Sequence, residues 1–233
     1  MNCSAALWSR LDLDGPAVLV PGLTEPTLTS QLERLLDELP ARFALAGLSL
    51  GGIVAMALVR AAPERVSSLT LLSTNPHAPS DQQRQGWRAA RDALASGRSA
   101  RELQSDWLPL LLSEPARRRA DLVELTLGMG DEVGATGLDA QLAMQATRVD
   151  ERPALRQVRC PTEIIAARQD ALCGLPRHQE LHTLIPGSSL QTVEDCGHLS
   201  PLERPEVLGP LLRARSASVQ PEEPGSPRPD GPR

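Results

Sequence analysis

The chain has 233 residues, of which 41% are hydrophobic and 23% are charged, and its formal net charge is −5. This length and composition suit one globular domain with an insertion, large enough to bury a core. The acidic balance, the lack of a basic stripe and an aromatic content of 2% argue against nucleic-acid binding. No apolar run approaches the about 20 residues that span a bilayer and no signal peptide is evident, so we expect a cytoplasmic protein without membrane contact.

The first informative pattern lies at residues 47–51, which have the form G-x-S-x-G with Ser49 at the centre. A helix over 27–39 and a short apolar strand over 42–46 are predicted before it. After it, residues 51–62 predict a buried helix that ends at a proline. A strand that turns sharply into a helix is the setting that a nucleophile elbow requires.

The tight turn is expected to strain the backbone of Ser49, so that nothing bulky fits two residues away on either side. Gly47 and Gly51 meet that demand. The hydroxyl would be exposed above the sheet at the positive end of the helix, and the N–H of Leu50 would point to where an oxyanion forms. On the motif alone, an unreactive Ser in a tight turn is the alternative.

A helical stretch is predicted between about residues 77 and 152. Capping boxes at 80–83 and 99–102 indicate that at least two helices start there. Such an insertion would form a cap that selects the substrate, although ordinary helix packing is the favoured interpretation for most of its apolar residues. We expect one or two of four large side chains to line a pocket: Trp87, Trp107, Met129 and Met144.

Two more strands are predicted in the C-terminal half, each followed by a candidate catalytic side chain. The strand over 160–167 leads to Asp170, and the strand over 189–193 leads to His198. Open parallel sheets place their ligands at the carboxyl edge of the strands, and a serine nucleophile needs a histidine base that a carboxylate orients. Residues 200–203 have the form of a capping box, which would fix the loop that holds His198.

A metal site is weakly indicated. His178 and His182 stand four residues apart on a predicted helix, but Glu180 falls one position late for the zinc-protease order H-E-x-x-H, and no third ligand is evident. A solvated helix face is the favoured interpretation, so we expect no metal and no cofactor. Four scattered cysteines without a C-x-x-C pair indicate a reducing compartment, and Cys196 is expected to pack rather than react.

Taken together, these motifs resemble those of the α/β-hydrolase superfamily, whose order along the chain is Ser, acid and then His. Residues 46–52 are similar to its nucleophile elbow, 168–170 to its acid loop and 197–205 to its histidine loop. Among subfamilies, the chain is most similar to small bacterial carboxylesterases of the pimeloyl-[acyl-carrier protein] methyl ester esterase type. The resemblance implies an α/β-hydrolase fold, with a mostly parallel sheet flanked by helices and a helical cap.

The resemblance also implies a role for each of three residues. Ser49 would be the nucleophile, His198 the general base and acid, and Asp170 the residue that orients the histidine. The expected division of the chain is a core of residues 1–76 and 153–213, a cap of residues 77–152, and a disordered, proline-rich tail of residues 214–233.

Other carboxylates compete with Asp170 for the acid role. Glu163 lies inside a predicted strand, and Asp195 is too close to His198 along the chain. In some relatives the acid follows the strand after the elbow helix, but here that strand, over 69–72, is followed by no carboxylate. This comparison favours Asp170.

The N-terminal region departs from the family pattern. Family members open with several strands, one of which ends in His-Gly or Pro-Gly and supplies the second oxyanion donor. Residues 18–23 resemble this strand, but Ser49 follows Leu23 by only 26 residues (49 − 23). That interval is too short for the helix, strand, helix and strand that the family places there.

A better fit shifts the N-terminal assignment by one unit. Residues 5–11 become the first family helix, residues 17–20 become the strand after it, and the second oxyanion donor falls near Asn2. On this interpretation the chain starts after a family strand. Residues upstream of Met1 would then supply a strand beside the one over 42–46.

Two classes of function remain. One is a serine hydrolase, EC 3.1.1, that cleaves a carboxylic ester, thioester or lactone of a small molecule through an acyl-enzyme, with Leu50 and a donor near Asn2 holding the oxyanion. The other is a catalytically weak or inactive protein that binds a small ligand or a partner in the same pocket. The complete set of triad motifs favours the first, and the incomplete N-terminal region favours the second.

Overall fold

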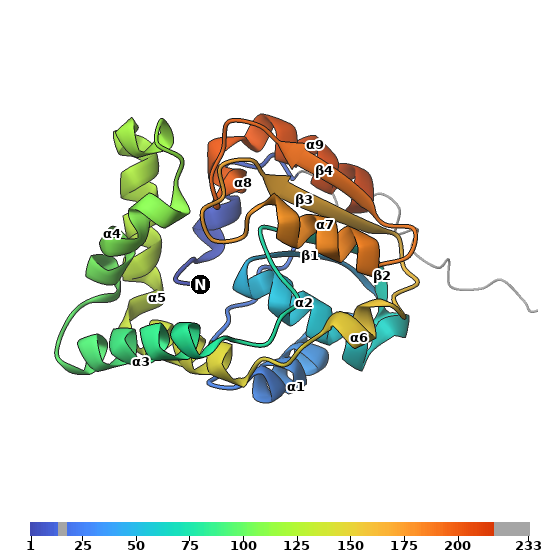
Figure 1. The fold of residues 1–233 in the computed structure, drawn as a ribbon, viewed down its shortest axis with the longest axis horizontal. Coiled ribbons are helices and arrows are strands. Elements are labelled where there is room, and N and C mark those ends of the chain that lie inside the picture. The colour runs from blue at the N-terminus through green and yellow to red at the C-terminus, as the bar shows by residue number, and fades with distance from the viewer. Residues whose placement is uncertain (14–17, 217–233) are drawn as a thin grey trace, which may run out of the picture.

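The computed structural model describes residues 1–13 and 18–216 of the chain. At the centre of this part lies a four-stranded parallel sheet in the order β1-β2-β3-β4 (Figure 1). The strands are β1 Phe43–Leu48, β2 Val66–Leu72, β3 Thr162–Ala167 and β4 Ser189–Val193. Because all four run in the same direction, their carboxyl ends meet at one edge of the sheet.

The burial of each strand follows its place in the sheet. The central strands β2 and β3 are buried along nearly their whole length, as expected for strands covered on both faces, and their buried residues include the polar Ser68, Thr70, Thr162 and Glu163. The outer strands β1 and β4 alternate between exposed and partly buried residues and end in buried residues. The strands predicted over 42–46, 69–72, 160–167 and 189–193 are confirmed, and β1 extends two residues beyond the prediction to Leu48.

Helices cover both faces of the sheet. One face is covered by α2 and α7, with α6 beside them, and the other by α8, α9 and the 3-10 turn η1. The apolar helix α2 is buried on nearly all sides because α1 packs against its outer surface. The bounds are η1 Ala5–Trp8, α1 Leu28–Glu38, α2 Leu50–Ala61, α6 Arg152–Leu155, α7 Leu175–Leu184, α8 Ser200–Glu203 and α9 Pro205–Ser216, with a further 3-10 turn η2 Pro63–Arg65.

The segment between β2 and α6 contains the helices that we call the cap, drawn mainly in green at the left of Figure 1. It contains α3 Asp81–Ala95, α4 Ala100–Leu111, the 3-10 turn η3 Ala116–Arg118 and α5 Ala120–Thr147. Both predicted capping boxes are present, with Ser80 at the start of α3 and Ser99 at the start of α4. Gly134 has a φ of 67° and bends α5, a conformation that glycine adopts without steric cost.

The N-terminal prediction is wrong in two respects. The helix expected over 5–11 is only the 3-10 turn η1, which the Ser4 hydroxyl caps. Residues 18–20 form no strand, and Val18, Leu19 and Val20 are 55%, 58% and 41% exposed. A strand needs a neighbouring strand to satisfy its N–H and C=O groups, and in the described ranges β1 pairs with β2 alone. Residue 17 lies outside the described residues.

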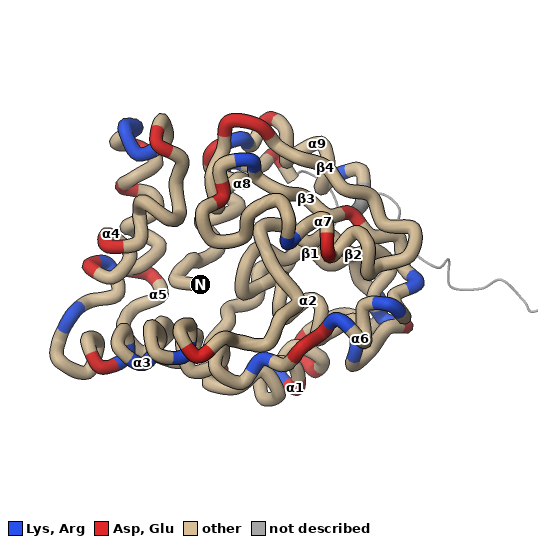
Figure 2. Tube along the Cα trace, viewed as in Figure 1, with Lys and Arg blue, Asp and Glu red and all other residues tan. Residues whose placement is uncertain are grey.

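Charged side chains of both signs are interspersed over the outer helices and loops (Figure 2). No basic stripe of the kind that tracks a nucleic-acid backbone runs across this view. None of the described helices combines the length and the apolar character that crossing a bilayer requires. Helix α9 continues to Ser216, past the expected start of the tail, and residues 217–233 lie outside the described part.

Candidate active site

Ser49 lies at the sharp turn between β1 and α2. Its φ of 55° and ψ of −115° fall in a region that residues other than glycine rarely adopt. Two backbone hydrogen bonds hold the turn: Ser49 N–H donates to Leu72 O at 3.0 Å, and Ile53 N–H donates to Ser49 O at 3.1 Å. The Ser49 hydroxyl does not cap α2, and Ser49 lines a pocket at the carboxyl edge of the sheet.

The steric demands of this turn fall on Gly47 and Gly52. A Cβ atom at Gly47 would lie 2.3 Å from the carbonyl oxygen of Gly51, and one at Gly52 would lie 2.7 Å from the Thr74 side chain. A Cβ at Gly51 would meet nothing within 4 Å. The expectation for Gly47 is therefore confirmed, while the second required glycine is Gly52 rather than Gly51. Thr74 is fixed against this glycine because its hydroxyl donates to Ser49 O at 2.9 Å.

Helix α2 begins at Leu50, directly after Ser49. The first N–H groups of a helix have no acceptor inside it and carry the positive end of the helix dipole. The N–H of Leu50 is one of these groups. It remains the candidate oxyanion donor that the sequence indicated.

Asp170 and His198, which follow β3 and β4, meet at the carboxyl edge and are both buried. His198 Nδ1 lies 3.0 Å from Asp170 Oδ1 and 2.9 Å from Oδ2. Burial alone raises the pKa of Asp170, but His198 and the N–H groups of Cys173 and Leu172 lower it to about 2. The carboxylate is therefore ionised at neutral pH and holds Nδ1, which leaves Nε2 for another partner.

The competing carboxylates lie elsewhere. Glu163 lies within β3, and Asp195 is an exposed residue whose carboxylate is 3.3 Å from the Arg204 guanidinium. Among the described side chains, the carboxylate hydrogen-bonded to His198 is that of Asp170. The geometry thus pairs the histidine with the acid that the sequence favoured.

Glu203 holds the histidine loop in a way that the sequence did not indicate. Its buried carboxylate accepts the Gly197 N–H at 3.1 Å and the Ser113 N–H at 3.2 Å, and it lies 2.5 Å from the Ser113 hydroxyl. Burial raises the pKa of Glu203. A Cβ at Gly197 would lie 2.6 Å from Ser113 N, so glycine is required beside His198.

The capping box expected at 200–203 is absent. Leu199 occupies the N-cap position of α8, and the buried Ser200 hydroxyl has no partner among the described groups. The glutamate that the pattern assigned to the capping box is Glu203, which binds across to the end of α4 instead. The long-range contact between Glu203 and Ser113 takes the place of the local capping contact expected with Ser200.

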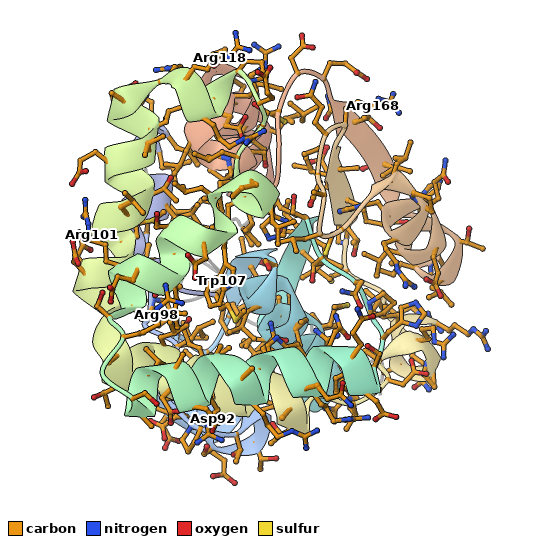
Figure 3. All side chains as sticks on the ribbon, turned by 60° about the vertical axis from the view of Figure 1, so that its left-hand side comes forward. Asp92, Arg98, Arg101, Trp107, Arg118 and Arg168 are labelled. Carbon is orange, nitrogen blue, oxygen red and sulfur yellow. The ribbon has the colours of Figure 1, made fainter. Side chains whose placement is uncertain are left out.

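A pocket of about 280 Å³ joins Ser49 and His198 to the cap. Of the four large cap residues, Trp87 and Trp107 line it, and Figure 3 shows Trp107 pointing from α4 toward the centre of the molecule. Met129 and Met144 are fully buried in helix packing instead. The sequence did not indicate the polar lining residues Thr74, Asn75, Gln83, Gln145 and Arg148; of these, Gln83 belongs to the capping box at 80–83 and the others to no motif.

The expectation for Asn2 is not met. Asn2 is buried, and its backbone N–H donates to Gln141 Oε1 at 2.6 Å, while its side-chain amide donates to Ala100 O and Gln104 Oε1. A buried N–H takes the nearest acceptor, and the cap supplies one. The N-terminal segment therefore docks between cap and sheet, as Figure 1 shows, without a free N–H at Asn2.

The metal prediction changes in detail. His178 is fully buried with Nδ1 near Gly174 O at 3.3 Å, so the solvated face expected there is wrong for it and right for the exposed His182. Asp170, Cys173 and His198 do place ligand atoms within 4.8 Å of one another. Two of these three groups, the His198 ring and the Asp170 carboxylate, are hydrogen-bonded to each other, and burial raises the pKa of the Cys173 thiol to about 12.

Comparison with known proteins gives relatives that match most of the chain. A family model described as "Alpha/beta hydrolase family" matches residues 11–209. The chain is 31% identical over 198 residues to a pimeloyl-[acyl-carrier protein] methyl ester esterase of Aromatoleum aromaticum. This alignment covers 80% of the chain and 79% of the relative.

Solved structures agree with the sequence comparison. A hydrolase from Pseudomonas aeruginosa is 27% identical with a TM-score of 0.71, covering 88% of this chain and 76% of that one. A thermophilic esterase from Thermogutta terrifontis is 23% identical with a TM-score of 0.77, covering 91% and 85%. At that identity the second likeness concerns the fold alone, and the fold is the one that the motifs predicted.

Proposed function

The chain belongs to the α/β-hydrolase family, and from this premise we propose that it is a serine hydrolase that cleaves a carboxylic ester of a small molecule. Thioesters and lactones fall within the same chemistry. One observation carries the proposal: the strained Ser49 lines the same pocket as His198, whose Nδ1 is hydrogen-bonded to the buried Asp170. Relatives named as esterases support an assignment to EC 3.1.1.

In the first step, Ser49 Oγ attacks the ester carbonyl carbon while His198 Nε2 accepts the hydroxyl proton. Asp170 keeps Nδ1 protonated and stabilises the imidazolium that forms. The tetrahedral intermediate collapses, the bond from carbonyl carbon to leaving oxygen breaks, and His198 gives its proton to the departing alcohol. Ser49 is then esterified with the acyl group.

In the second step, His198 takes a proton from water, whose oxygen attacks the acyl-enzyme carbonyl. Collapse of this second intermediate breaks the bond to Ser49 Oγ, and His198 returns the proton to the serine. The acid is released and the enzyme is restored. In both steps the N–H of Leu50 stabilises the negative oxygen, a contribution that is typically worth about 10²–10³ in rate.

One observation favours the second class of function considered from the sequence. The N–H of Asn2 is engaged by Gln141, so the second oxyanion donor expected near Asn2 is occupied. An enzyme with a single oxyanion donor would turn over slowly. In the extreme case, the protein would bind its ligand without hydrolysing it.

Hydrolysis of p-nitrophenyl butyrate by the purified protein separates the two. We expect multiple turnovers that are lost in Ser49→Ala and retained in Ser96→Ala, which removes an exposed cap hydroxyl that bonds only to Asp92 O. Retained turnover in Ser49→Ala would refute the nucleophile. Saturable binding of the ester without product release would establish the binding protein instead.

A further inference from the structure

The cap side of the pocket contains a buried arginine without an acidic partner. Arg148 is the C-cap residue that follows α5. It is 6% exposed and lines the same pocket as Ser49 and His198. In the described part of the chain, no carboxylate forms an ion pair with its guanidinium, and no Asp or Glu is among the residues that line the pocket. Arg60 near the end of α2 differs, since its guanidinium is paired with the buried carboxylate of Glu151 at 2.8 Å.

Neutral groups hold the guanidinium in place. One terminal nitrogen donates to Gln145 Oε1 at 2.9 Å and the other to Gln83 Oε1 at 3.0 Å. The Trp87 ring lies 5.2 Å from the guanidinium carbon, close enough for a cation–π contact. All three partners also line the pocket, so the charged group itself lies at the pocket wall.

These contacts leave donors unused. A guanidinium has five N–H groups. Two are accounted for by the glutamines, and Nε–H has no partner among the described groups. The amides orient the guanidinium but bring no negative charge.

The guanidinium of Arg148 keeps its positive charge despite being buried. Burial and the nearby Arg84 lower the pKa of Arg148 to about 10, with Cys173 acting in the opposite direction, so the group is cationic at neutral pH. An uncompensated buried charge is costly unless a counter-ion reaches it. In this pocket, the counter-ion has to come with the ligand.

We propose that Arg148 is a carboxylate-binding subsite and that the substrate is a small ester with a second, ionised carboxylate, such as a monoester of a dicarboxylic acid. This inference rests on the proposed hydrolase function. One planar guanidinium between neutral amides matches a single carboxylate, whereas phosphate groups are usually bound by several cationic or N–H donors. The carboxylate on Arg148 would fix the position of the ester carbonyl relative to Ser49.

Matched substrates test this subsite. The monomethyl esters of succinic to pimelic acid are compared with the corresponding monoamide methyl esters, which keep the shape and lose the charge. We expect kcat/KM to favour the acid by at least tenfold at the best chain length. Equal values for acid and amide at every length in the wild type would overturn the subsite, even though the hydrolase function would stand.

Variants place the effect on Arg148. In Arg148→Met, which removes the charge and keeps an apolar stem, the acid-to-amide ratio should fall to about one, and Arg148→Lys should restore part of it. The control Arg91→Met removes an exposed cap arginine paired with Asp139, and its ratio should stay at the wild-type value.

An unchanged acid-to-amide ratio in Arg148→Met would overturn the assignment of the subsite to Arg148. Should that variant not fold, the wild-type ratio decides the proposal. Failure of every ester, with no reaction at Ser49, would count against the proposed function instead.

Discussion

The sheet side and the cap side of the pocket treat their buried charges differently. On the sheet side, Asp170 faces His198 and two backbone N–H groups, which lower its pKa to about 2 despite burial. On the cap side, Arg148 faces two amide oxygens and an indole ring, and burial lowers its pKa to about 10. The paired charge of Asp170 fits the proposed role of holding His198, and the unpaired charge of Arg148 fits the proposed role of binding a ligand.

This difference suggests a division of labour. The carboxyl ends of the four strands form one edge, and the proposed catalytic residues Ser49, Asp170 and His198 follow β1, β3 and β4. The cap joins the sheet-bearing part before α3 and after α5, and its pocket-lining residues lie on or at the ends of α3, α4 and α5 rather than at strand ends. Substitutions on the sheet side should therefore change the rate of the chemical step, and those on the cap side should change substrate preference or stability.

The largest effect is expected at Asp170. Asp170→Asn should lower kcat by orders of magnitude, because the imidazole loses the partner that fixes its tautomer; a related triad substitution costs about 10⁴-fold. Asp195→Asn is the matched control, since Asp195 is exposed and asparagine tolerates its φ of 52°. Initial rates on one activated ester compare the two. A larger loss of rate in Asp195→Asn than in Asp170→Asn would contradict the assignment of Asp170 as the acid.

A smaller effect is expected at Glu203, which connects the two sides. Glu203→Gln keeps the shape but cannot accept all three hydrogen bonds from Gly197 and Ser113. We expect kcat to fall about tenfold and stability to fall by about 1–3 kcal/mol, the typical cost of an unsatisfied buried group. Urea unfolding and kcat are measured together, with the exposed Glu206→Gln as control. A stability loss with unchanged kcat would restrict Glu203 to a structural role.

The charge of Asp170 should also appear in the pH dependence of folding. Its pKa is lowered from 3.8 to about 2, so its stabilising contribution is present above 3.8 and is lost as the pH falls toward 2. A shift of this size corresponds to about 2 kcal/mol. The difference in unfolding free energy between wild type and Asp170→Asn should therefore shrink as urea titrations move from pH 5 toward pH 2. A constant difference would mean that the pair does not stabilise the fold.

The smallest effect is expected on the outer surface of the cap. Ser99→Ala removes the hydroxyl that caps α4 and should cost about 1 kcal/mol of stability. Ser99 is exposed and does not line the pocket, so kcat/KM should change little. Thermal unfolding and ester hydrolysis measure both quantities. A large loss of rate would mean that the cap helices are coupled more tightly to the sheet edge than the division above allows.

The parts predicted well from sequence depend on local patterns. The strands contain short apolar runs, and a glycine-flanked serine between a strand and a helix has few other geometries, so the turn at Ser49 could be recognised directly. Asp170 and His198 follow from the rule that parallel strand ends share an edge. The capping boxes of α3 and α4 are equally local, since each needs only four consecutive residues.

The parts predicted poorly depend on contacts between distant residues. Glu203 matched a capping pattern, but its partners are Gly197 and the Ser113 backbone, 90 residues away in the chain. The N-terminal strand was assigned by counting family elements, although Val18 to Val20 have no strand to pair with. Arg148 belongs to no motif, because what distinguishes it is that no carboxylate of residues 1–13 and 18–216 forms an ion pair with it, which no sequence pattern records.

The most direct test of the account is to map the covalent adduct of a fluorophosphonate on the native protein. Trypsin cleaves after Arg42 and Arg60, which releases a peptide in which Ser49 is the only hydroxyl side chain. We expect one adduct per chain, located by mass spectrometry on this peptide and absent from Ser49→Ala. An adduct on another peptide, or labelling that persists in Ser49→Ala, would contradict the assignment of Ser49 as the nucleophile.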